Sequence, residues 1–122
     1  MAVIADPALS AYDFGRGHPM APIRVQLALR LAQDLGLFQL PGVELIRSVA
    51  PAGVHDLVKV HVPDFLTAVR NAGHTGDPGD PRFGMGTDDV PVFPRMHEAA
   101  SHLCGSSVRA VEEVHSGRAQ HA

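Results

Sequence analysis

The sequence predicts an α/β protein with a parallel sheet that is covered by helices on both faces. The main observation is the order of the predicted segments, which is strand, helix, strand, short helices and a long helix. The composition, with 45% apolar and 19% charged residues, is typical of a globular protein. The length of 122 residues fits one small domain or part of a larger one.

The first predicted elements are a strand and a helix joined by a loop. Residues 2–5 form a short apolar run that ends at Asp6 and Pro7, which predicts a buried strand. Pro22 suits the first turn of a helix, and Gly36 suits the left-handed residue after its end. Because its apolar surface is broad, we expect this helix to be largely buried. Its apolar positions are Val25, Leu27, Ala28, Leu31, Ala32 and Leu35.

A second strand and two short helices follow. Residues 43–49 alternate loosely between apolar and polar side chains and end at Pro51, which predicts a strand. Residues 54–60 and 63–72 predict two short helices. Residues 73–91 form a long loop rich in Gly, Asp and Pro. Long loops in compact domains are often functional or disordered.

The longest helix is predicted over residues 94–116 and ends before Gly117. Its small residues, including Gly105, would permit close packing against a sheet. An apolar face with helical spacing comprises Met96, Ala99, Ala100, Leu103, Ser107, Val111 and Val114. The opposite, polar side is expected to hold Glu98, Arg109, Glu112 and Glu113.

The α/β order calls for another strand beginning near Ala119, but only a few residues remain there. Two or three short strands make a poor sheet. We therefore expect the sequence to be a truncated part of a larger domain. Isolated, it should fold weakly, because apolar helix faces and a sheet edge would be exposed.

Charge and targeting signals narrow the possible partners and location. The net charge is −3, and no basic stripe or polybasic cluster indicates nucleic acid or a membrane surface. The first residues do not form a signal peptide, and no apolar run approaches the ~20 residues of a membrane span. Cys104 is the single cysteine, so no internal disulfide is possible. We expect a cytoplasmic protein.

No catalytic or metal-binding motif is complete in the sequence. Eight histidines are present, but none forms a His-Glu-x-x-His pattern or an i, i+4 pair on a helix. We expect most of them to be surface or hydrogen-bonded structural residues, although a trio of ligands brought together by loops stays open. No Gly-x-Ser-x-Gly turn marks a nucleophilic serine.

Two loops stand out as candidate sites. The loop that begins at Tyr12 leads to Arg24, a cation in a first helical turn, where it opposes the helix dipole. A buried Arg24 would need a partner or a wet cavity, whereas the alternative is an exposed side chain at a frayed helix start. In the second loop, Asp88 and Asp89 precede a proline. Such a carboxylate can accept hydrogen bonds from a ligand's backbone, or it can simply cap a turn or helix.

Both loops carry a family resemblance. Tyr12-Asp-Phe-Gly-Arg-Gly-His-Pro-Met-Ala-Pro-Ile-Arg24 resembles the opening of the histone deacetylase superfamily, especially its bacterial acetoin-utilisation branch. Phe83-Gly-Met-Gly-Thr-Asp-Asp-Val-Pro-Val-Phe-Pro94 resembles the next motif of that branch, and residues 51–70 resemble its helical pair. The resemblance implies an arginase/deacetylase-type three-layer fold with a central parallel sheet. Residues 1–122 would be the N-terminal portion of one such domain.

The resemblance also implies roles for individual residues. Asp89 corresponds to the rim aspartate that holds the substrate backbone, and Arg24 to the arginine of the cavity behind the site. The paired catalytic histidines and the zinc ligands of the family would follow Ala119, so we assign no catalytic or metal residue here. Gly53 stands where relatives usually have a helix-capping hydroxyl. The residues that match the loop at the site floor are Tyr12, Gly17, His18, Met20 and Pro22.

The function implied is that of a zinc-dependent deacetylase that hydrolyses acetyl-lysine amides, with Zn²⁺ in the complete enzyme and none bound by this part. Its partner would be an acetyl-lysine protein or a small acetylated amine. Two alternatives stay open. One is a non-catalytic, truncated relative that acts at most as a binding piece. The other is part of an acetylpolyamine amidohydrolase.

Overall fold

The computed structural model describes residues 1–122 and contains one small parallel sheet. Strand β1 (Ala2–Ile4) pairs with β2 (Glu44–Ile46), and Val3 lies opposite Leu45. The connection between the strands contains η1 (Pro7–Ala11), α1 (Ile23–Asp34) and η2 (Leu37–Gln39). After β2 come α2 (Val54–Leu57), α3 (Pro63–Thr75), η3 (Pro81–Phe83) and α4 (Met96–His115).

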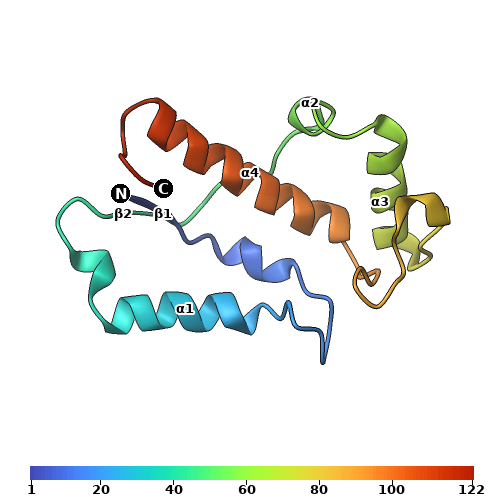
Figure 1. The fold of residues 1–122 in the computed structure, drawn as a ribbon, viewed down its shortest axis with the longest axis horizontal. Helices are drawn as coiled ribbons and strands as arrows, with labels where there is room; N and C mark the ends of the chain where they lie inside the picture. The colour runs from blue at the N-terminus through green and yellow to red at the C-terminus, as the bar shows by residue number, and fades with distance from the viewer.

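The sheet lies between α1 and α4, and α3 packs beside the start of α4 (Figure 1). The result is three layers of helix, sheet and helix, which confirms the predicted α/β class with a parallel sheet. Each predicted strand and helix is present with shifted ends. The 63–72 helix extends to Thr75, and a short 3-10 turn at Pro81–Phe83 interrupts the predicted long loop. None of the helices has the length and hydrophobicity of a membrane-spanning segment.

Buried residues form two small clusters. The cluster at the sheet contains Ala2, Ile46 and Ala119. The larger cluster joins α3, the following loop and α4, and comprises Val69, Ala72, Met85, Phe93, Met96 and Ala99. Only 15 of 122 residues are buried, so neither cluster forms an extended core.

The expectation that the 22–36 helix is largely buried is wrong. Helix α1 has no buried residue, and Leu27, Leu31 and Leu35 are 60%, 60% and 65% exposed. The helix packs mainly on η1 and η2 and lines an open apolar cavity beside β1, and its leucine stripe stays exposed. Its predicted end is confirmed, because Gly36 follows it in the left-handed conformation with a φ of 72°.

The predicted packing face of α4 is correct in its first half and wrong in its second half. Met96 and Ala99 are buried, but Val111 is 67% exposed. Close packing instead occurs at Gly105, where an added Cβ would lie 2.2 Å from the carbonyl oxygen of Ala50. The backbone N–H of Ala52 also donates to the carbonyl of Ser101 at 2.8 Å. The small residues Ser101 and Gly105 of α4 therefore contact the segment after β2.

Glu113 was expected on the polar side of α4, but its side chain is only 1% exposed. It is buried because two arginines bind its carboxylate. The guanidinium of Arg109 donates to Oε1 at 2.6 Å, and that of Arg118 donates to Oε2 at 2.9 Å. Hydrogen bonds from Arg118 and then Arg109 hold the pKa of Glu113 below its ordinary value of 4.5, although burial acts in the opposite direction.

The Glu113 cluster also directs the chain after α4. Gly117 turns the chain with a φ of 76°, and the N–H of Ala119 then donates to the carbonyl of Glu113 at 3.0 Å. The N–H of Ala2 donates to the carbonyl of His121 at 2.8 Å. No strand forms near Ala119, and this segment lies next to β1, where the α/β order would place a third strand.

Helices α3 and α4 meet closely at Gly73, where an added Cβ would lie 3.0 Å from the backbone nitrogen of Met96. The N–H of Arg95 donates to the carbonyl of Gly73 at 3.0 Å. Arg95 adopts the left-handed conformation, with a φ of 60°, which costs a non-glycine residue roughly 1–2 kcal/mol. The α3–α4 contact and its hydrogen bond offset that strain.

Replacing Gly105 with alanine should lower the free energy of unfolding by about 1–3 kcal/mol, because the new Cβ would overlap the backbone of residues 50–52. The higher helix propensity of alanine would offset about 1 kcal/mol of the destabilisation caused by this overlap. Urea unfolding measures the difference. Ser107→Ala, at an exposed position of the same helix, is the control and should change stability little. Equal stability of Gly105→Ala and wild type would contradict the close contact.

Replacing Glu113 with glutamine should lower the Tm at pH 7, because Arg109 and Arg118 lose their shared carboxylate. Since the folded-state pKa of Glu113 is depressed, its contribution is complete above about pH 4.5 and is lost as pH falls through the folded-state value. Thermal unfolding from pH 7 to 3 should therefore show a shallower acid loss for Glu113→Gln. The exposed neighbour provides the control, Glu112→Gln, which should behave as wild type.

Candidate functional site

The two loops singled out in the sequence lie against each other in the structure. Three aromatic rings join them in edge-to-face contacts. The ring of Tyr12 lies 5.1 Å from that of Phe14 and 5.3 Å from that of Phe93, and Phe14 lies 5.6 Å from Phe93. Phe93 is itself buried in the larger cluster. The aromatic contacts thus fix the first loop to the base of the second.

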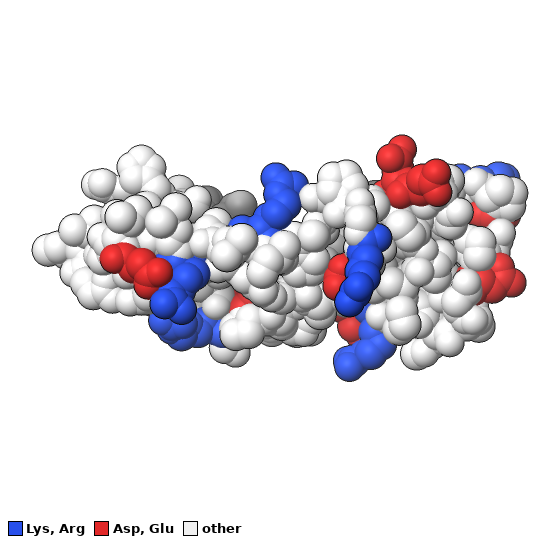
Figure 2. Space-filling view, turned by 90° about the horizontal axis from the view of Figure 1, so that it is seen from below, with Lys and Arg blue, Asp and Glu red and all other residues white.

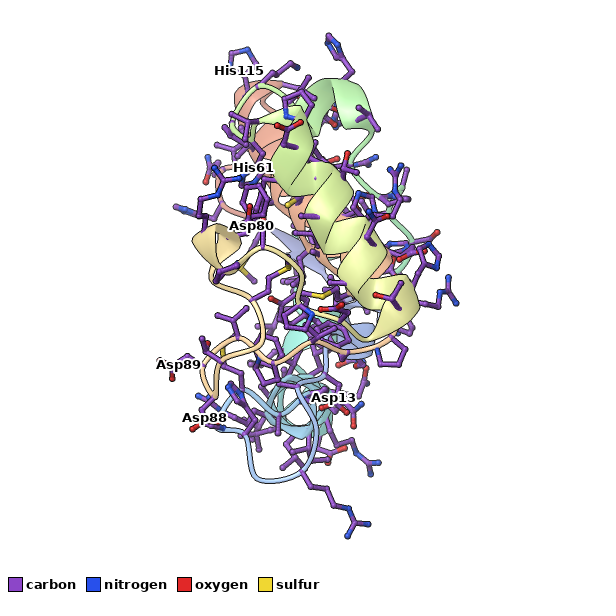
Figure 3. The ribbon with its side chains drawn as sticks, turned by 90° about the vertical axis from the view of Figure 1, so that its right-hand side faces the viewer. Asp13, His61, Asp80, Asp88, Asp89 and His115 are labelled. Atoms are coloured by element: carbon purple, nitrogen blue, oxygen red, sulfur yellow. The ribbon has the colours of Figure 1, made fainter.

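A polar cleft of about 740 Å³ lies between the loops. The first loop contributes Arg16 and His18, and the second contributes Thr87, Asp88 and Asp89. In Figure 3 the labelled Asp88 and Asp89 lie together at the tip of their loop, far from His61 and His115. Charges of both signs are interspersed on the face seen in Figure 2, with no continuous basic stripe.

Asp89 is exposed and takes no part in any of the five salt bridges. It does not cap α4 either, because the residue before that helix is Arg95 and no side chain caps it. Of the two roles considered for this carboxylate, helix capping is therefore wrong. Its oxygens are free to accept hydrogen bonds from a ligand in the cleft.

Arg24 lies in the first turn of α1 and is exposed. Its Nη1 donates to the carbonyl of Pro19 at 3.1 Å, which ties the helix start to the preceding loop. The side chain also lines a separate, mainly apolar cavity of about 740 Å³, together with Tyr12, Met20 and Leu103. The structure therefore places Arg24 and Asp89 in different cavities, and Tyr12 connects them through its aromatic contacts.

Tyr12 also borders a third cavity of about 400 Å³ between α3 and α4, whose lining includes His61, His97 and Cys104. Burial, with a smaller effect of Cys104, raises the pKa of Tyr12 above 10.0, so its hydroxyl stays protonated at neutral pH. The Nε2 atom of His97 is buried without a hydrogen-bond partner. Burial and the nearby Arg70 lower the pKa of His97 below 6.5.

The sequence did not distinguish His97 from the other histidines. It is an exception to the expectation that most of the histidines are surface or hydrogen-bonded residues, because its Nε2 is neither exposed nor bonded. Its location beside a cavity could not be predicted from its position in the sequence. That cavity depends on contacts between α3, α4 and the loop, which are distant in sequence.

No three His, Cys, Asp or Glu side chains converge closely enough to hold a metal ion. Zinc in proteins normally has three or four such ligands. The residues of this chain therefore do not fit the zinc ion that the resemblance implies for a complete enzyme, and the histidine trio that stayed open at the level of sequence does not form.

The Histone deacetylase domain model matches residues 18–122. The chain belongs to the histone deacetylase family. It is 36% identical over 121 residues to the Acetoin utilization protein AcuC of Bacillus subtilis (strain 168), covering 98% of this chain and 30% of that protein. It is 30% identical over 116 residues to Histone deacetylase 3 of Oryza sativa subsp. japonica, with coverage of 92% and 22%. Histone deacetylase clr6 of Schizosaccharomyces pombe is 29% identical over 121 residues, with coverage of 94% and 28%.

These matches confirm the family resemblance and its acetoin-utilisation branch. The relatives include proteins named as histone deacetylases, so the chain belongs to a family of amide-hydrolysing enzymes. The chain spans about 30% of the length of the AcuC protein and 22% of the rice deacetylase. The substrate-binding roles of Arg24 and Asp89 remain predictions.

Replacing His97 with phenylalanine should raise the free energy of unfolding at pH 7.5 by about 1 kcal/mol, because a buried nitrogen without a partner is removed. The free energy of unfolding of the variant should also depend less on pH. Since the folded-state pKa of His97 is lowered, the unfolded chain binds protons first as pH falls below about 6.5, and wild type loses stability.

Urea unfolding at pH 7.5 and 5.5 measures both effects. The control is His115→Phe, at an exposed position near the end of α4. If wild type and His97→Phe lose the same stability between pH 7.5 and 5.5, His97 is not the cause of the pH dependence.

Proposed function

We propose that this chain forms the substrate-holding part of a zinc-dependent deacetylase of the acetoin-utilisation type, which hydrolyses acetyl-lysine amides. The observation that carries the proposal is the free carboxylate of Asp89 at the tip of a loop over a polar cleft. The segment that holds it lies within the matched family domain. Hydrogen bonds from peptide N–H groups to such a carboxylate are charge-assisted and directional, so Asp89 would fix the substrate backbone beside the cleft.

Arg24 supports the proposal from the second cavity. An arginine on an otherwise apolar wall is suited to a small carboxylate such as acetate, since its guanidinium matches the two carboxylate oxygens. The side chain has no salt bridge that would compete with this role. Tyr12, which is protonated at neutral pH, borders the same cavity and can donate a hydrogen bond there.

We assign the chemical step to parts of the family domain outside these 122 residues. The chain covers about 30% of the AcuC protein, and its own side chains form no metal site. On this proposal the isolated chain binds substrate but does not hydrolyse it. A non-catalytic relative that only binds its ligand would make the same contacts. The two proposals differ in whether a catalytic part of the domain exists outside these residues.

The substrate alternative is an acetylated polyamine. Asp88 provides a second free carboxylate next to Asp89 at the same cleft. Two adjacent carboxylates would attract the free amino group of a polyamine more strongly than a neutral peptide backbone. Binding of a polyamine should therefore depend on Asp88, whereas binding of a peptide should not.

The test titrates the 122-residue chain with an acetyl-lysine peptide and with N-acetylputrescine, using NMR. Asp89→Asn should weaken peptide binding by about tenfold, as expected for the loss of a hydrogen bond to a charged group. Asp88→Asn is the matched control and should leave peptide binding nearly unchanged. Polyamine binding that depends on both carboxylates, with no peptide binding, would favour the alternative substrate.

A zinc-supplemented assay of the same chain with the peptide should show no turnover above blank. Zinc-dependent turnover would contradict the assignment of the chemical step outside residues 1–122. Peptide binding that is unaffected by Asp89→Asn would contradict the substrate-holding role.

A further inference from the structure

The tip of the second loop, residues 86–90, is closed by two hydrogen bonds. The backbone N–H of Gly86 donates to the carbonyl of Val90 at 2.9 Å. The N–H of Val90 donates to the hydroxyl oxygen Oγ1 of Thr87 at 3.1 Å. Asp88 and Asp89 lie between these residues, so the Thr87 side chain joins the two ends of the segment that presents both carboxylates.

The base of this tip loop is held firmly. Gly86 has a φ of 81°, and a Cβ at this position would lie 2.6 Å from Cβ of Pro78. Met85 just before the tip loop and Phe93 shortly after it are buried in the larger cluster. The tip itself is exposed and forms no salt bridge. Within residues 86–90 the Thr87 hydroxyl makes the one side-chain hydrogen bond, and this bond spans the backbone that carries Asp88 and Asp89.

We propose that Thr87 is a positioning residue, whose hydroxyl holds the N–H of Val90 and thereby keeps the Asp89 carboxylate directed at the cleft. The inference rests on the proposed role of Asp89 in holding the substrate backbone. A loop that is ordered before binding loses less conformational entropy when the ligand arrives, so binding is tighter. Thr87 acts through Asp89 and makes no substrate contact of its own.

The hydrogen bond has a readout that needs no ligand. In Thr87→Val, which keeps the shape of the side chain but removes the hydroxyl, the Val90 amide should exchange with solvent about tenfold faster. Thr87→Ser keeps the hydroxyl and should restore the wild-type exchange rate. The Tm of both variants should match wild type, because the tip is exposed. An unchanged Val90 exchange rate in Thr87→Val overturns the inference.

The positioning role is tested by the affinity of the 122-residue chain for an acetyl-lysine peptide. Thr87→Val should weaken binding several-fold, and Thr87→Ser should restore it. In the Asp89→Asn background the Thr87→Val change should have no further effect, since the hydroxyl acts through that carboxylate.

The possible failures are distinguishable. Equal weakening by Thr87→Val in both backgrounds, or no weakening while Asp89→Asn weakens binding, overturns the positioning role and leaves the proposed function intact. Binding that is unaffected by Asp89→Asn overturns the proposed function and, with it, the positioning role, whatever the Val90 exchange rate.

Discussion

Helix α4 can organise the protein because Gly105 allows the backbone of residues 50–52 to lie directly against it. That contact places the segment after β2 beside the middle of α4, while α3 packs on its first turns and β1 on its far half (Figure 1). The two buried clusters are small and separate. Helix α4 contacts both clusters and so fixes their relative position. A larger residue at Gly105 would therefore disturb the packing of both.

Much of the fold was predictable because its elements are encoded locally. Gly36 and Gly117 both follow a helix in the left-handed conformation, as their positions in the sequence indicated. The burial of individual faces was less predictable, because it depends on what covers them. The leucines of α1 have the spacing of a buried face, yet they are exposed. Glu113 has the chemistry of a surface residue, yet it is buried, because Arg118 approaches from beyond the end of its own helix.

The candidate site likewise has some features that the sequence predicts and others that it does not. The loop residues that carry the family resemblance could be found in the sequence, and the structure does bring their two segments together through Tyr12, Phe14 and Phe93. Two features could not be predicted from the sequence. One is that Arg24 and Asp89 line different cavities. The other is the buried, unpartnered nitrogen of His97, which arises from packing between segments that are distant in sequence.

The separation of the two cavities has a physical consequence for a deacetylase-type site. Asp89 is exposed to solvent in a polar cleft, where a peptide backbone can exchange water for its carboxylate. Arg24 lies on the mainly apolar wall of an open cavity, where its exposed guanidinium could pair with a carboxylate. Tyr12 contacts the loops of the first environment with its ring and borders the second. Tyr12 therefore lies at the boundary of the two environments: its ring packs on Phe93 at the base of the second loop, and its side chain borders the cavity at Arg24.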